Sequence, residues 1–212
     1  MRELRPGLWH WTARHPDWTP EEGGPEGWDP DVSSYLFEAA GALVLFDPLA
    51  PDWDDLDERV ERLGAPNVLL TIFWHVRSAP EILDRYPEAR VFAHERGLDE
   101  VRKRVEQTVS FAAGGRLPGE VEAITTRYRE ALFWLSGLRA LVAGDVLLGT
   151  KGRAVRVCPD SWLGDRMTPE ELRTELRSRL DRPVEAILLT HGEPVLENAR
   201  EALDRALARF DA

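Results

Sequence analysis

Three short stretches of the sequence place residues that can bind a metal ion or move a proton directly after a run of apolar residues. Asp145 follows one run and His191 follows another. His75 and Arg77 follow a third run, which contains Thr71. Carboxylates and imidazoles are zinc ligands as well as general acids and bases, and a guanidinium binds phosphate or carboxylate. Because each apolar run is typical of a strand, we expect Thr71, Asp145 and His191 to lie together at one end of the sheets.

Each of these residues also has a purely structural explanation. Asp145 could cap the tight turn that begins at Gly144, and His191 could hydrogen-bond the adjacent loop. His94 follows a short apolar run and is more typical of a surface or structural histidine. Cys158 has no neighbour in the sequence that would activate its thiol.

Short strands and helices alternate along the chain, apart from a long exposed loop over 16–31 that is rich in Pro, Gly and acidic residues. Apolar runs predict strands, and apolar residues at helical spacing predict helices. The predicted strands are 8–12, 34–37, 42–46, 67–73, 90–93, 120–125, 131–135, 140–143 and 184–189. The predicted helices are 52–63, 79–86, 98–109, 168–180 and 196–210. Two β-rich halves with helices after strands favour packed sheets with helices outside them, in a single domain over 1–212.

The composition is that of a globular chain, and it limits the partners. Of 212 residues 43% are hydrophobic, and the single cysteine excludes an internal disulfide and a Cys-rich zinc site. A net charge of −11 argues against nucleic acid and anionic membranes, which both need a basic surface. With no apolar run of membrane-spanning length and no visible secretory signal, a cytoplasmic location is expected. The sequence leaves the oligomeric state open, including a homo-oligomer.

Four segments, in order and at suitable spacing, together resemble the metallo-β-lactamase superfamily. Residues 43–48 are similar to an early strand of that superfamily that ends in an Asp, and residues 68–79 stand at its metal cluster. Residues 141–149 resemble the segment whose Gly-Asp bridges two metals, and 188–194 resemble the last strand, which carries a ligand His. The resemblance implies an α+β fold, the four-layer αββα sandwich with two mixed β-sheets flanked by helices. It also implies a hydrolase with zinc as cofactor.

The same resemblance indicates that most of the expected metal ligands are replaced. The superfamily reads His-x-His-x-Asp-His after the residue that matches Thr71. In this chain the four ligand positions hold Ile72, Trp74, Val76 and Arg77.

A further ligand His of the superfamily falls on Arg127 or on Tyr128. His75 is one residue out of register with the ligand positions. Only Asp145 and His191 then remain, and two protein groups do not hold a stable zinc ion. We therefore expect a degenerate metal site without a zinc cofactor.

Two of the replacements are arginines, which could take over the charge of the missing metals. Loss of two divalent ions would leave Asp145 buried with an uncompensated charge. A guanidinium can form two parallel hydrogen bonds to that carboxylate, so we expect Arg77 or Arg127 within salt-bridge reach of Asp145. The cationic pocket that results could hold a small anionic ligand such as phosphate or carboxylate. Asp47 is expected to support the neighbouring loop, as its counterpart does in the superfamily.

Three functions remain open at this point. The favoured one is a metal-free member of the fold, a pseudoenzyme that binds a small anion without metal-dependent hydrolysis. The second is an enzyme with altered chemistry, in which His75 or His191 acts as a general acid or base. The third is a residual hydrolase with one metal on Asp145, His191 and a recruited His75 or His94. Bound metal would separate the third function from the first two.

Overall fold

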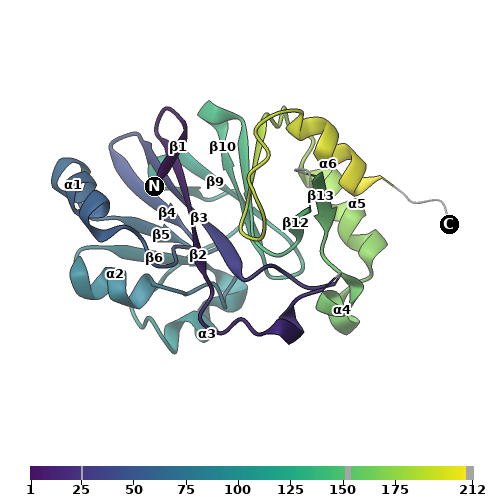
Figure 1. The fold of residues 1–212 in the computed structure, drawn as a ribbon, viewed down its shortest axis with the longest axis horizontal. Coiled ribbons are helices and arrows are strands. Elements are labelled where there is room, and N and C mark those ends of the chain that lie inside the picture. The colour runs from purple at the N-terminus through teal and green to yellow at the C-terminus, as the bar shows by residue number, and fades with distance from the viewer. Residues whose placement is uncertain (25, 151–153, 209–212) are drawn as a thin grey trace.

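The first of two β-sheets is built from the N-terminal half of the chain (Figure 1). The computed structural model describes residues 1–24, 26–150 and 154–208, and within these residues the sheet has seven strands in chain order. These strands are β1 (Arg2–Arg5), β2 (Leu8–Arg14), β3 (Asp31–Ala39), β4 (Ala42–Phe46), β5 (Asn67–Leu69), β6 (Arg90–His94) and β7 (Val109–Phe111). The strands β1 to β4 pair antiparallel and β4 to β7 pair parallel, so the sheet is mixed.

The second sheet comes from the C-terminal half and has five strands in the described residues. Their order across the sheet is β14 (Ala186–Leu189), β11 (Ala140–Ala143), β10 (Ala131–Leu135), β9 (Val121–Thr125) and β8 (Arg116–Leu117). The β11–β14 pair is parallel and the other pairs are antiparallel. A separate hairpin pairs β12 (Leu147–Thr150) with β13 (Ala154–Val157).

Helices flank the two halves (Figure 1). The helices α1 (Trp53–Leu63), α2 (Ala79–Arg85) and α3 (Leu98–Arg102) accompany the first sheet. The helices α4 (Asp160–Leu163), α5 (Pro169–Arg179) and α6 (Ala199–Leu207) accompany the second sheet. None of the helices in the described residues is both long enough and apolar enough to cross a lipid bilayer.

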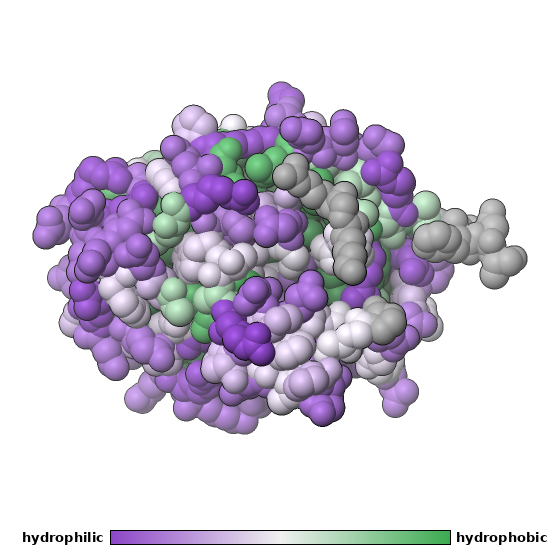
Figure 2. All heavy atoms as spheres, in the orientation of Figure 1, coloured by the Kyte–Doolittle hydropathy of each residue, from purple (hydrophilic) through white to green (hydrophobic). Residues whose placement is uncertain are grey.

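Three separate hydrophobic clusters show that these elements form four layers. The middle cluster joins residues of β3 and β4 to residues of β10 and β11, so it fills the space between the sheets. A second cluster joins the other face of the first sheet to α1, α2 and α3, and a third joins the second sheet to α5 and α6. Hydrophilic residues make up most of the face shown in Figure 2, and apolar residues appear on this face only in smaller patches. The predicted αββα architecture is confirmed.

Several predicted boundaries differ from the structure. The strand predicted over 67–73 ends at Leu69, because the chain turns through the next residues toward α2. The helix predicted over 98–109 ends at Arg102, and β7 follows it. The last helix spans Ala199–Leu207, and residues 209–210 of its predicted range lie outside the described residues.

Polar side chains of β2 and β3 tie the first sheet to the end of β14. Ser33 Oγ donates to the carbonyl oxygen of Gly192 at 2.9 Å. The hydroxyl of Tyr35 donates to the carbonyl oxygen of Leu189 at 2.8 Å. His10 Nε2 lies 2.9 Å from Ser33 Oγ. Because the serine proton is used on Gly192, His10 Nε2 must carry a proton and donate it. This chain of bonds fixes the backbone around His191 relative to the first sheet.

We expect His10 to make the fold less stable in mild acid. Burial lowers the pKa of His10 to about 4, whereas a histidine in the unfolded chain titrates near 6.5. As the pH falls below about 6.5 the unfolded state therefore takes up a proton first, and the free energy of unfolding decreases by up to roughly 3 kcal/mol at pH 4. Urea unfolding of the wild type and His10→Gln between pH 7.5 and 4 measures this loss. The difference in stability between the two proteins should change over this range, and a constant difference would contradict the assignment.

Candidate functional site

Three side chains that can bind a metal meet at one end of the two sheets. Asp145 follows β11, His191 follows β14, and His75 lies in the loop between β5 and α2. Asp145 Oδ1 lies 3.2 Å from Nε2 of His75 and 3.2 Å from Nε2 of His191. The three candidate ligand atoms all lie within 4.8 Å of one another. The prediction that Asp145 and His191 share one end of the sheets is confirmed, and His75 joins them.

A buried glutamate holds the turn that carries Asp145. Glu130 precedes β10 and is fully buried, and its carboxylate accepts the backbone N–H groups of Gly144, Asp145 and Val146 at 2.8–2.9 Å. The turn also packs closely on the β5 loop, since a Cβ at Gly144 would lie 2.3 Å from Thr71 Oγ1. Burial and the charge of Asp145 raise the pKa of Glu130 to about 8. The Asp145 carboxylate is thus placed by a second acid that the sequence analysis did not identify.

The Asp47 carboxylate holds the other two segments of the site. It accepts the backbone N–H of Thr71 at 2.9 Å and the hydroxyl of Thr71 at 2.5 Å. It also accepts the hydroxyl of Thr190 at 3.0 Å, next to His191, and lies 3.0 Å from Nδ1 of His75. Asp47 therefore supports the loop, as expected, and it orients the His75 ring so that Nε2 faces Asp145.

Opposite charges offset the cost of burying the two aspartates. Burial is the largest influence on each aspartate and raises its pKa. The partners together outweigh it and hold both pKa values below their usual range: His75 with Arg77 and Thr71 at Asp47, and His75 with His191 at Asp145. Burial lowers the pKa of His75, whereas the charges of Asp145 and Asp47 more than reverse this and raise it to about 9. Burial keeps the pKa of His191 below its ordinary value. In the absence of a metal ion, protonated His75 is thus the cation that lies between the two aspartates.

The donor set fits one metal ion of the zinc type. Bonds of about 2.0–2.1 Å put two ligand atoms of a tetrahedral ion about 3.3 Å apart, close to the 3.2 Å from Asp145 Oδ1 to each imidazole nitrogen, and the two imidazole nitrogens lie within 4.8 Å of each other. Asp145 Oδ1 is buried, and its close polar neighbours are the two imidazole nitrogens. In Asp145 and in His75, the polar atom that does not face the other ligands is bound by a neighbouring side chain. Trp74 Nε1 donates to Asp145 Oδ2 at 2.7 Å, and Asp47 binds His75 Nδ1, which is the usual support of metal-binding histidines.

The predicted salt bridge between Asp145 and an arginine is wrong. Arg77 is buried and donates through Nη1 to the carbonyl oxygens of Asp47 and Ser33, at 2.8 and 3.3 Å. It forms no salt bridge with a carboxylate in the part of the chain that the structure describes. Asp145 is contacted instead by His75, His191 and Trp74, which leave an arginine no place on it.

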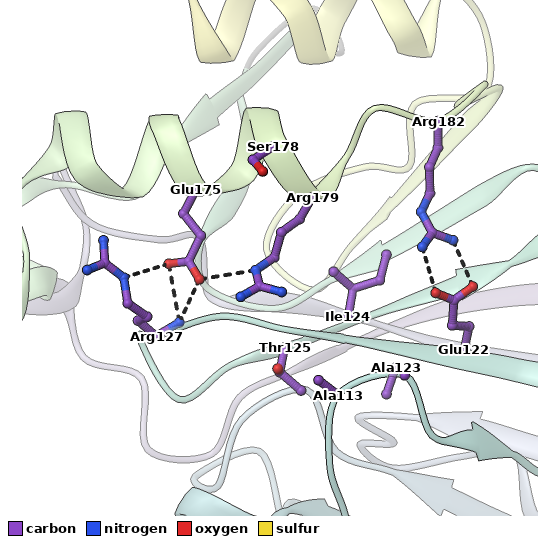
Figure 3. A pocket seen from close by; sticks show the side chains of 11 residues that line it. Ala113, Glu122, Ala123, Ile124, Thr125, Arg127, Glu175, Ser178, Arg179 and Arg182 are labelled. Carbon is purple, nitrogen blue, oxygen red and sulfur yellow. Dashed lines mark hydrogen bonds and ion pairs between the residues drawn. The ribbon is translucent and has the colours of Figure 1, made fainter.

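Arg127 lies in a different part of the molecule. Its backbone N–H and its Nε bind Glu175 of α5, and Arg179 binds the same carboxylate (Figure 3). Arg182 pairs with Glu122 of β9 further along the same groove, which has a volume of about 610 Å³. The Arg127 pair joins α5 to the loop after β9, and the Arg182 pair joins β9 to the segment after α5, which is a sufficient structural role for them.

The other sequence candidates have structural surroundings. Tyr128, the alternative to Arg127, lines the cavity above the site, and its hydroxyl donates to the carbonyl oxygen of Trp162 at 2.7 Å. His94 accepts the N–H of Arg96 through Nδ1 and is not among the three converging ligands. Burial raises the pKa of the Cys158 thiol to about 12, so this cysteine is inert as a nucleophile at neutral pH.

A cavity of about 510 Å³ opens over the three converging ligands. Its wall includes Arg77 and four aromatic side chains, which are Trp28, Trp74, Tyr128 and Trp162. Trp28 comes from the long loop between β2 and β3, and its ring packs edge-on at 4.9 Å from the ring of His191. A cavity of this size admits a small molecule to the metal-binding atoms.

Comparison with known proteins shows the fold. No protein-family model matches the sequence, and no curated protein matches it in sequence. The structure is similar to a metallo-beta-lactamase family protein from Thermus thermophilus, with a TM-score of 0.61, 19% identity, and coverage of 96% of this chain and 79% of the other. It is also similar to an archaeal metallo-beta-lactamase superfamily protein from Sulfolobus tokodaii, with a TM-score of 0.64, 14% identity and coverage of 95% and 84%.

A third similar structure is a rubredoxin oxygen:oxidoreductase from Desulfovibrio gigas, with a TM-score of 0.66 and 13% identity. The match covers 97% of this chain but only 59% of that one. The protein therefore has the metallo-β-lactamase fold. Since identities are below 20%, the comparisons establish the architecture, and the chemistry has to be argued from the site.

We expect removal of the Glu130 carboxylate to destabilise the fold. Glu130→Ala leaves three buried N–H groups without an acceptor, which should lower the free energy of unfolding by about 3–5 kcal/mol. Glu130→Gln keeps the shape and one acceptor oxygen and should lose less. Urea denaturation measures both changes. Glu106→Ala, at an exposed position, serves as the control and should stay within about 0.5 kcal/mol of the wild type. A Glu130→Ala protein as stable as this control would show that the turn does not depend on Glu130.

Proposed function

We propose that this protein is a metal-dependent hydrolase in which one divalent ion, held by His75, Asp145 and His191, replaces the two-metal cluster of its fold. The observation that carries the proposal is the convergence of two imidazole nitrogens on one buried carboxylate oxygen, with all three ligand atoms within 4.8 Å of one another. Two histidines and one carboxylate are an established ligand set of catalytic zinc, with the fourth position open to water or substrate.

The site is degenerate relative to the superfamily pattern, and the replacements explain why one ion is favoured over two. Ile72 and Val76, at two former ligand positions, are buried side chains without a donor atom. Within residues 1–24, 26–150 and 154–208 only one group of side chains has metal-ligand spacing. A second ion would therefore find no comparable set of donors beside the first.

The side chains around this centre have defined tasks. A bound ion of the zinc type polarises a carbonyl or phosphoryl group and makes a water molecule nucleophilic near pH 7. Asp47 fixes the tautomer of His75 so that Nε2 presents a lone pair, and the indole N–H of Trp74 fixes the rotation of the Asp145 carboxylate. Trp28 and Trp162 pack beside the His191 ring and limit the access of bulk water to it.

The metal-free pseudoenzyme is the second candidate. It is favoured by the pKa of His75, because a protonated His75 balances the buried aspartates without an ion. Both candidates keep the fold and the cavity and differ in whether a cation can displace the His75 proton. Metal binding itself therefore decides between them.

We expect the protein, stripped with a chelator, to rebind one Zn²⁺ per chain. Isothermal titration calorimetry gives the stoichiometry, and replacement by Co²⁺ gives a visible absorption band whose intensity reports the coordination number. His75→Ala should abolish binding, because two protein ligands do not hold zinc stably. His94→Ala is the matched control and should bind as the wild type does, since His94 is not among the converging ligands.

Hydrolysis of a panel of chromogenic esters, thioesters and β-lactams should follow the metal content and be restored when the ion is returned. Circular dichroism of the metal-free variants separates lost binding from lost structure. A wild type that is folded and binds no Zn²⁺ would overturn the proposal and leave the metal-free protein as the function.

A further inference from the structure

The cavity wall contains a buried cation whose hydrogen-bonding capacity is largely unused. Arg77 is 7% exposed, and of its three guanidinium nitrogens only Nη1 has acceptors, the carbonyl oxygens of Ser33 and Asp47. Nε and Nη2 are buried without a hydrogen-bond partner among the described residues. A buried guanidinium with unpaired donors is costly, and such groups in proteins normally face a partner. Since neighbouring protein groups leave these donors unpaired, a ligand is the natural partner.

The backbone at Arg77 is also unusual. Its φ of 44° lies in the left-handed region, where residues other than glycine are uncommon. Arg77 precedes α2, and this conformation directs the chain from the β5 loop into that helix. Backbone of this kind occurs at tight turns and at ligand and active sites. The position thus keeps a long cationic side chain at a place where the local geometry alone would favour a glycine.

Much of the remaining wall of the cavity is aromatic, and the exposed residues Asp17, Glu22 and Arg104 lie at its outer part. The indole N–H of Trp28 donates to Glu22 and that of Trp74 donates to Asp145, so both rings turn apolar surface to their surroundings. Trp74 is 42% exposed and is the exposed large hydrophobic side chain of the described residues. Flat apolar groups bind well against such rings. The cavity therefore combines a cation with surfaces for a flat apolar group.

We propose that the substrate is a small molecule with an oxyanion, a carboxylate or a phosphate, on a flat apolar group, and that Arg77 binds the oxyanion. This inference rests on the proposed function in placing the bond to be cleaved at His75, Asp145 and His191. Arg77 is a specificity-determining residue in this arrangement, because it selects charged molecules from neutral ones of the same shape. Its position next to the three ligands fixes how far the oxyanion lies from the reacting bond.

Non-hydrolysable probes test the inference by binding alone. Benzoate and phenyl phosphate carry the two oxyanions, and benzamide is the neutral molecule of the same shape as benzoate. Quenching of tryptophan fluorescence, checked by calorimetry, gives the dissociation constants for protein loaded with one metal ion. We expect at least one of the two anions to bind about tenfold or more tightly than benzamide, as a charge-assisted hydrogen bond implies. The tighter of the two identifies the oxyanion. Equal binding of both anions and benzamide would overturn the proposal.

Substitutions test whether Arg77 is the residue that makes anions bind more tightly than benzamide. Arg77→Gln should reduce the preference for the anion about tenfold while benzamide binds as before. Arg127→Gln is the matched control, since Arg127 lies in the groove between α5 and β9 and does not line this cavity (Figure 3). It should bind every probe as the wild type does. An Arg77→Gln protein that is folded and keeps the full preference would overturn the proposal, because the metal ion or another cation would then hold the anion.

The metal content of the same samples distinguishes failure of the proposed hydrolase function from failure of the proposed Arg77 site. Arg77→Gln should retain one Zn²⁺ per chain, because Arg77 contributes no ligand atom. If no ion binds to the wild type, the hydrolase proposal fails, and the probes are then measured on the metal-free protein. A preference for the anion that Arg77→Gln removes from that protein would support the Arg77 site alone. If that protein shows no preference for the anion, the Arg77 site is overturned as well.

Discussion

The site depends most on one buried carboxylate, that of Asp47. Four hydrogen bonds converge on it, from the backbone and the hydroxyl of Thr71, from the hydroxyl of Thr190 and from His75. These donors come from the loop after β5 of the first sheet and from the end of β14 in the second sheet, and Asp47 itself follows β4. Asp47 is only 1% exposed, so these bonds form in a low-dielectric interior, where losing one of them is costly. The two sheets are thus held in register at the place where the ligands meet.

The predictability of the fold follows from how strongly each strand is buried. The strands β4, β10 and β11 consist mainly of buried apolar residues, and their sequence pattern indicates them directly. The strands β1, β8 and β13 are two to four residues long and include exposed positions, so no pattern identifies them. The four-layer arrangement followed from the resemblance, because the pattern alone does not say which sheet faces which.

The site was predictable only where position in a strand determines the direction of a side chain. Asp145 and His191 directly follow strands, and both reach the site. His75 lies in a loop between β5 and α2, and a register counted along the motif does not give the direction of a loop side chain. Glu130 binds backbone groups 14 to 16 residues further along the chain, a relation that no local spacing contains.

The arginine prediction was wrong because charge balance gives the sign of the missing group and not its identity. The imidazole of His75 is short enough to stand between two aspartates, whereas Arg77 extends past them to backbone carbonyls. Trp74 then occupies the second oxygen of Asp145, which an arginine fork would have needed. A replacement at a ligand position is therefore constrained by reach and volume as well as by charge.

The charges of the buried cluster link the metal site to the ligand that we infer. In the metal-free protein the carboxylates of Asp47 and Asp145 face two cations, Arg77 and protonated His75. Burial and the nearby Asp145 charge raise the pKa of Glu130 to about 8, whereas the three backbone N–H groups that it accepts favour its ionised form. Exchange of the His75 proton for a divalent cation would add one positive charge to this buried group. An uncompensated charge of this kind is unfavourable, and a ligand that carries one negative charge removes it. Under the proposed function, the electrostatics that balance the site without an ion would therefore favour an anionic ligand once an ion is bound.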